Sequence, residues 1–129
     1  MGSKEFRDTL LDVYSMQFKD YDDFVKKYGQ WLSKGNAQTA ISLVAVYFSE
    51  MGLLLYKKII DIDFTYNLIG FFHVKIFWEK TKPLIVGLRE QFNDPTVFLW
   101  LEYLYNEIKK REPKLKKAEM EVFNRSSRD

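Results

Sequence analysis

Two side chains in this sequence have the chemistry of a catalytic acid or base, and both stand in apolar segments. Glu50 lies near the middle of residues 41–56, which are apolar on nearly every face of a helix. A carboxylate inside a helical bundle can act as an acid, a base or a metal ligand. It must lie at a wet edge or be held inside by partners, because an unpaired buried carboxylate costs several kcal/mol or takes up a proton.

His73 is the only histidine. Paired with a carboxylate it could serve as a general base, but its flanking phenylalanines are typical of a core or boundary histidine. A di-metal bundle site needs Glu-x-x-His on two helices, whereas the residue three before His73 is Gly70. We therefore expect no metal site. Phosphate-loop and dinucleotide glycine patterns are also absent, so we expect no cofactor, and an enzyme using Glu50 and His73 requires both to face one solvent-reachable cavity.

A basic cluster lies near the carboxy terminus. Residues 109–117 carry a local charge of +5, and the rest of the chain has fourteen basic against seventeen acidic residues; the cluster consists of Lys109, Lys110, Arg111, Lys114, Lys116 and Lys117. Such a cluster can bind phosphate, nucleic acid or an anionic membrane surface. Alternatively, the cluster complements the negative end of the preceding helix and keeps the carboxy terminus soluble. We favour this second interpretation, because a domain that binds nucleic acid is usually basic as a whole.

Length and composition indicate one compact domain. The chain has 129 residues, of which 47% are hydrophobic. Without cysteine it has no disulfides or thiolate metal sites, and we expect a cytoplasmic location. The longest uncharged stretch, residues 35–49, is 15 residues long. Since a membrane span needs about 20 residues, we expect no transmembrane segment.

The apolar periodicity is helical throughout and predicts an all-α fold: a single irregular, mostly antiparallel bundle of about five helices. We expect helices over about 3–16, 20–32, 37–59, 64–92 and 95–112, with the third as the interior spine. A short connection at Gly35 and Asn36 would make the second and third antiparallel neighbours. Pro83 should kink or break the fourth, and Pro113 should end the fifth. Residues 1–113 would form the bundle domain, and 114–129 a basic tail that is partly helical or disordered.

The order of features from Tyr47 to Arg111 resembles a prokaryotic family of small helical domains of unknown function. The resemblance rests on the Glu50-Met-Gly-Leu segment, the Trp78 helix leading to Arg89-Glu90, and the Asn93-Asp-Pro95 helix start. It implies that Glu50 is a structural residue of a polar core. There it would accept a hydrogen bond from the indole of Trp78 or pair with Arg89. The family supplies no reaction.

Aromatic residues are abundant, with 22 in the chain. Those of the fifth predicted helix, including Phe98, Trp100, Tyr103 and Tyr105, are spread so that one face cannot hide them all. Either the core wraps both sides of that helix, or some rings form an exposed patch. The sequence favours a non-enzymatic protein–protein interaction or scaffold module that self-associates as a homo-oligomer. The alternative is nucleic-acid or anionic-surface binding through the basic segment.

Overall fold

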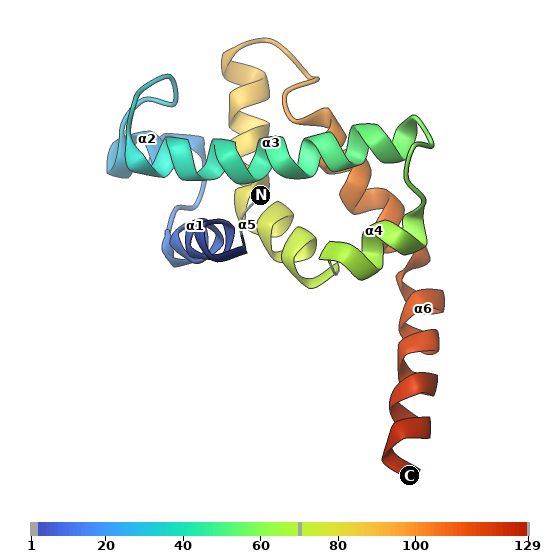
Figure 1. The fold of residues 1–129 in the computed structure, drawn as a ribbon. Coiled ribbons are helices and arrows are strands. Elements are labelled where there is room, and N and C mark those ends of the chain that lie inside the picture. The colour runs from blue at the N-terminus through green and yellow to red at the C-terminus, as the bar shows by residue number, and fades with distance from the viewer. Residues whose placement is uncertain (1–2, 70, 129) are drawn as a thin grey trace.

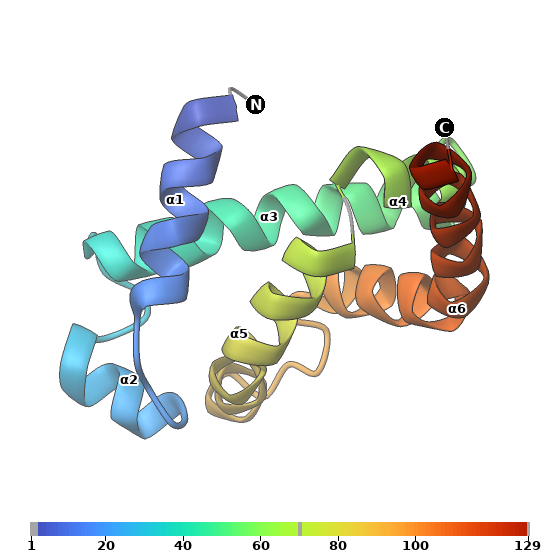
Figure 2. The same cartoon turned by 90° about the horizontal axis from the view of Figure 1, so that it is seen from below.

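The computed structural model describes residues 3–69 and 71–128, and all regular structure among them is helical. Six helices follow one another (Figures 1 and 2): α1 Ser3–Ser15, α2 Tyr21–Tyr28, α3 Asn36–Tyr56, α4 Ile62–Ile69, α5 Phe71–Gln91 and α6 Leu99–Arg128. The all-α prediction is confirmed. The described residues contain six helices rather than about five, because α4 and α5 both lie in the range expected for the fourth helix; residue 70, between them, lies outside the described residues.

The largest helix–helix interface joins α3 to α6. Gly52 of α3 lies against Trp100 of α6, and Leu55, further along α3, shares a surface hollow with Tyr103. Both helices therefore advance in the same direction, as both views show, and the second half of α5 crosses them (Figures 1 and 2). α2 packs mainly on α5 rather than on α3. The prediction of a mostly antiparallel arrangement does not describe these pairs.

The core lies between the inner stripe of α3, the length of α5 and the first half of α6. The fully buried side chains of these three helices include Ile41, Val44, Phe48, Phe77, Leu84, Ile85, Leu88, Leu101, Leu104 and Ile108. The rings of Phe48 and Phe77 meet edge to face with centroids 5.6 Å apart. These side chains recur at helical spacing, so burying one stripe of each helix forms one continuous core.

The outer face of α3 does not belong to this core. Of its most apolar window, only 28% is buried, and Leu43 and Val46 are exposed. The prediction that α3 is an interior spine is therefore wrong for half of the helix. Packing against α1 and α6 covers one side of a helix, and the fold has too few helices to cover the other.

By length and composition, α3 is the one helix among the described residues that could cross a membrane. This differs from the expectation based on the uncharged stretch 35–49, because a helix of 21 residues tolerates the single charge of Glu50. Central helices of water-soluble bundles have the same length and composition. The property alone does not assign α3 to a bilayer.

Gly29 ends α2 earlier than predicted, whereas Pro83 shows one of its two predicted outcomes, because α5 continues through it. Gly29 adopts φ +94° and donates its N–H to the Val25 carbonyl, which ends α2 at Tyr28 rather than near residue 32. Pro83 lies inside α5, which is bent but not broken along its length (Figure 1). The Thr81 hydroxyl donates to the Phe77 carbonyl at 2.7 Å, and the buried side chains that follow offset the helix bond lost at proline.

Pro113 does not end α6, which continues to Arg128 and projects from the body (Figure 1). Two contacts hold the turns after the proline. Leu115 packs against the core, and the Tyr66 hydroxyl of α4 donates a hydrogen bond to the Glu119 carboxylate. Burial raises the pKa of Tyr66 to about 12, and the hydrogen bond to Glu119 contributes to this rise as a smaller cause. We call residues 114–128 the C-terminal arm.

The contact of α3 with α6 generates the first prediction. A Cβ added at Gly52 would overlap the backbone carbonyl of Trp100, which cannot swing aside as a side chain can. Gly52→Ala should therefore destabilise the protein by about 1–3 kcal/mol or more, despite the better helix propensity of alanine. Thermal unfolding followed by circular dichroism measures this, with Ser42→Ala on the outer face of α3 as control. A melting temperature equal to that of the parent would show that the two backbones are not in contact.

Candidate functional site

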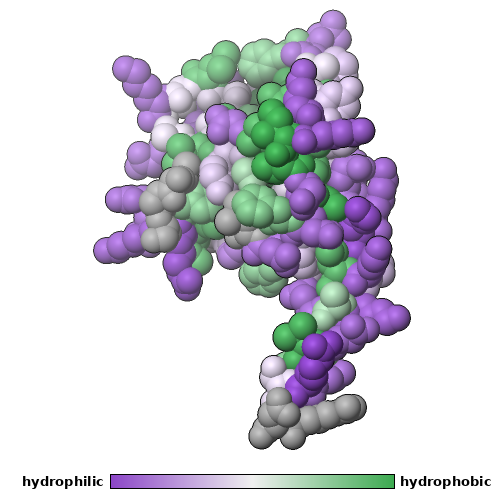
Figure 3. All heavy atoms as spheres, turned by 45° about the vertical axis from the view of Figure 1, so that its right-hand side comes forward, coloured by the Kyte–Doolittle hydropathy of each residue, from purple (hydrophilic) through white to green (hydrophobic). Residues whose placement is uncertain are grey.

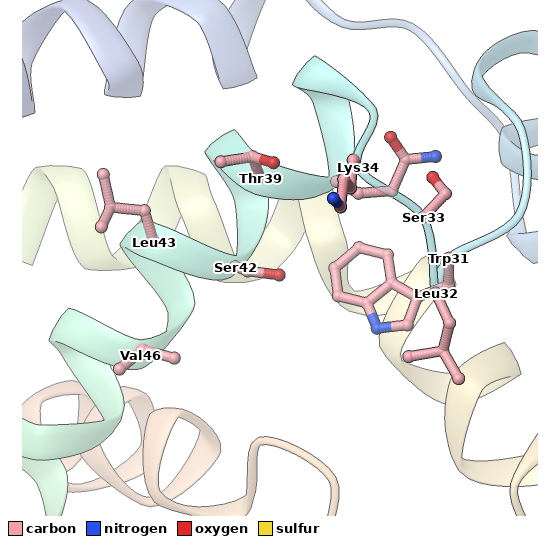
Figure 4. A pocket seen from close by; sticks show the side chains of 9 residues that line it. Trp31, Leu32, Ser33, Lys34, Thr39, Ser42, Leu43 and Val46 are labelled. Atoms are coloured by element: carbon pink, nitrogen blue, oxygen red, sulfur yellow. The ribbon is translucent and has the colours of Figure 1, made fainter.

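The most prominent surface feature is an apolar groove along the outer face of α3. It consists of two hollows of about 700 and 260 Å³ that meet at Val46. We call it the α3 groove; its lining is Trp31, Leu32, Ser33, Lys34, Gln38, Thr39, Ser42, Leu43, Val46, Ser49, Glu50, Leu53, Thr96, Phe98, Leu99 and Trp100. Figure 4 shows Leu43 and Val46 on one side of the larger hollow, with Trp31 and Leu32 across it.

The first wall of the groove is the segment between α2 and α3. Gln38, which is buried, donates from its side-chain Nε2 to the carbonyls of Tyr28, Gly29 and Gln30 at 2.9, 3.2 and 3.0 Å. This amide satisfies carbonyls that a helix would otherwise have paired. The wall is therefore fixed to the first turn of α3.

The second wall is the segment between α5 and α6. Arg89 donates its Nε–H to the Val97 carbonyl at 3.0 Å, and its Nη2 lies 3.0 Å from Glu102 Oε1 as an ion pair that is not aligned for a hydrogen bond. At the start of this segment, Thr96 donates two hydrogen bonds to the Asp94 carboxylate, and these lower the pKa of Asp94. The segment is thus tied to α5 and to α6.

Two aromatic rings connect the walls. Trp31 and Phe98 meet edge to face with centroids 6.4 Å apart, and Trp31 also packs on Phe24 of α2 at 6.1 Å. Phe98 has φ +53°, a left-handed conformation that costs a bulky residue about 1–2 kcal/mol. Such strain persists only where the surroundings impose it, and it often accompanies function. Here it places the ring against Trp31.

The predicted polar core of Glu50, Trp78 and Arg89 does not form. Glu50 is exposed in the α3 groove, Arg89 pairs with Glu102, and Trp78 is buried against Tyr105 with ring centroids 5.9 Å apart. The prediction is wrong because Glu50 lies on the outer stripe of α3, about half a turn from the stripe that faces α5 and α6. Of the two options for this carboxylate, the structure selects the wet edge.

His73 and Glu50 lie in different surroundings. The Nδ1 atom of His73 is 3.0 Å from the hydroxyl of Tyr14 on α1, whose pKa is raised by burial to about 12. Glu50 faces the segment between α5 and α6. The hollow that Glu50 lines does not include His73. Among the residues that the structure describes, no group of three potential ligands is placed to hold a metal ion. The geometry does not combine these two residues into an acid–base pair.

All six residues of the basic cluster are exposed on α6. They do not share one face, because successive residues of a helix turn by about 100°: Lys110, Lys114 and Lys117 lie on one side, and Lys109 and Lys116 on another. Lys110 pairs with Glu107 at 2.8 Å, which raises its pKa, and Lys109 lies 5.6 Å from the ring centre of Tyr105. Two of the six positive charges of the cluster therefore already interact with neighbouring side chains of α6.

Three aromatic residues in the first half of α6 pack against rings of two neighbouring helices. Trp100 and Tyr103 pack with Tyr56 of α3, while Tyr105 packs with Phe71 and Trp78 of α5. Tyr105 is buried in the core, whereas Phe98 and Trp100 line the α3 groove, so each of the two alternatives holds for some of these rings. Sequence reasoning missed that the outer face of α3 is exposed. The available signal was the small polar residues Thr39, Ser42 and Ser49, which share the outer stripe with Leu43 and Val46.

The Gln38 amide generates the second prediction. Gln38→Ala should leave three carbonyls without their donor and cost about 1–3 kcal/mol of folding free energy. It should also loosen the first wall, seen as faster amide hydrogen exchange in residues 29–34. Thr39→Ala, one position along and exposed, is the control. Unchanged hydrogen exchange in Gln38→Ala would show that the segment between α2 and α3 keeps its conformation without the Gln38 side chain.

Comparison with known proteins gives one match. No curated protein and no solved structure matches this chain. The profile of a family described as "Domain of unknown function (DUF4760)" matches residues 3–108. This range contains the whole α3 groove and stops before the basic cluster and the C-terminal arm. The chain belongs to the DUF4760 family.

Proposed function

We propose that this protein is a non-enzymatic protein–protein interaction module and that the α3 groove is its binding surface. The observation that carries the proposal is the exposure of apolar side chains in a preformed groove: Leu43 and Val46 are 44% and 48% exposed, and Leu32 is 78% exposed. An apolar groove rimmed by polar residues is typical of a surface that binds a partner. Its walls are fixed by Gln38, Arg89 and the Trp31–Phe98 contact, so little ordering would be needed on binding.

The shape of the groove indicates the kind of partner. It follows a single helix and is lined by apolar side chains on its floor and by aromatic rings on one side, which suits an amphipathic helix. Ser42, Ser49 and Glu50 add polar groups that orient such a helix. Among the residues that the structure describes, the buried Ser49 hydroxyl has no hydrogen-bond partner.

The test is affinity capture with quantitative mass spectrometry from the host cell. Leu43→Asp with Val46→Asp places charge in the groove and should reduce capture of groove partners by about tenfold or more, because each apolar side chain loses its burial. Val86→Asp is the matched control, since Val86 is 42% exposed on α5, outside the groove. If every captured protein is retained equally by both variants, the groove is not the binding surface.

The second candidate function is binding to an anionic surface or nucleic acid through the basic cluster. The observation that favours it is the exposure of all six side chains on a helix that projects from the body. Lys114→Glu with Lys117→Glu should abolish binding to phosphatidylserine vesicles or duplex DNA, and parental binding should weaken steeply with salt. Lys26→Glu with Lys82→Glu makes the same change of net charge elsewhere. Equal loss in both variants would point to overall charge rather than this cluster.

A further inference from the structure

The charged side chains of the α3 groove stand at its opposite ends. Of the residues that line the groove, Lys34 and Glu50 are the charged ones, and both are exposed. Lys34 precedes α3, and about 21 Å of helix separates Asn36, where α3 begins, from Glu50. At this distance the two charges cannot pair within one chain. Neither forms an ion pair with another residue that the structure describes.

Between the two charges the groove is mostly apolar. Leu43 and Val46 on its floor are 44% and 48% exposed, while Leu32 in the first wall and Leu99 just after the second are 78% and 40% exposed. The surface thus has a positive end, an apolar middle and a negative end. Such a surface is complementary to a second copy of itself that is turned by 180°, which is what the interface of a twofold dimer requires.

We propose that a second copy of this chain occupies the α3 groove, with its own α3 antiparallel to the first and the twofold axis near Ser42 and Leu43. This inference rests on the proposed function of the groove and names its partner. Position 42 is midway between Lys34 and Glu50, so reversing the chain direction there sets Lys34 of each copy opposite Glu50 of the other. Parallel pairing would set like charges opposite each other, which is unfavourable.

The walls of the groove fit the same arrangement. They meet through the contact of Trp31 with Phe98, so both lie along one side of α3. Antiparallel pairing then sets the first wall of one copy against the second wall of the other, and Leu32 lies near Leu99. The small side chain of Ser42 at the axis allows the two helices to approach closely. An exposed ion pair adds little affinity, so the apolar side chains hold the copies together and the charges set their orientation.

The C-terminal arm does not offer a comparable surface. Hydrophobic atoms are visible on the arm below the body (Figure 3). However, Leu115 and Val122 share their half of the helix with Glu119 and Arg125, because residues three, four and seven positions apart lie on the same side. The apolar side chains of the arm are therefore interrupted by charges, whereas those of the α3 groove lie between the charges.

Analytical ultracentrifugation of the full chain tests whether the groove holds a dimer. The parent should dimerise. Leu32→Asp should raise the dissociation constant by about 100-fold or more, because a twofold dimer contains this apolar contact twice. Val86→Asp, at a position 42% exposed on α5 and outside the groove, is the matched control and should dimerise like the parent. Circular dichroism checks that both variants are folded.

Charge exchange tests the antiparallel orientation. Lys34→Glu sets two carboxylates opposite each other at both ends of the interface, and Glu50→Lys sets two ammonium groups there. Each variant alone should dimerise about tenfold more weakly than the parent. An equimolar mixture of the two should form a mixed dimer as tight as that of the parent, since each end then contains one glutamate and one lysine. The double variant should also regain the parental dissociation constant. Lys26→Glu, outside the groove, controls for net charge.

Three results would overturn the proposal. A parent that stays monomeric at high concentration excludes the dimer, and a dimer that survives Leu32→Asp lies on another surface. Single charge variants that dimerise like the parent exclude the antiparallel orientation, because parallel pairing opposes like charges in the parent and in both variants. The proposed function is judged separately: it stands if capture of other proteins depends on Leu43 and Val46, and it fails if capture does not.

Discussion

The close approach of α3 and α6 at Gly52 is the constraint on which the rest of the structure depends. Because glycine has no side chain, the backbone of α3 lies directly against the carbonyl of Trp100. This contact fixes where α6 begins, and with it the segment that carries Phe98 and Leu99 beside the outer face of α3. A larger residue at position 52 would move both the core and the second wall of the groove.

The groove results from a shortage of helices relative to apolar surface. α3 is apolar on both sides, but the body packs only one of them, so the other stays open between two loop segments. Holding Phe98 in a left-handed conformation costs about 1–2 kcal/mol. The core offsets this cost, and the result is an apolar surface on α3 that stays exposed.

The body and the C-terminal arm differ in charge and in surface. The body is mildly acidic and leaves an apolar groove open, while the arm is basic and exposes Val122 and Phe123. The family profile ends at residue 108, so the groove belongs to the shared domain and the arm lies outside it.

The sequence alone determined the all-α class, the start of the second helix next to Asp20, and the inner stripe of α6 through Leu101, Leu104 and Ile108, because helical periodicity and capping act within a few residues. It did not determine that Pro83 and Pro113 lie inside helices, since that depends on distant contacts made by Leu84, Leu115 and Glu119. The sequence alone also did not show that Glu50 lies on the exposed face of α3 or that Arg89 forms an ion pair with Glu102. Which face of an apolar helix is covered depends on the helices that reach it, and only the tertiary structure decided that.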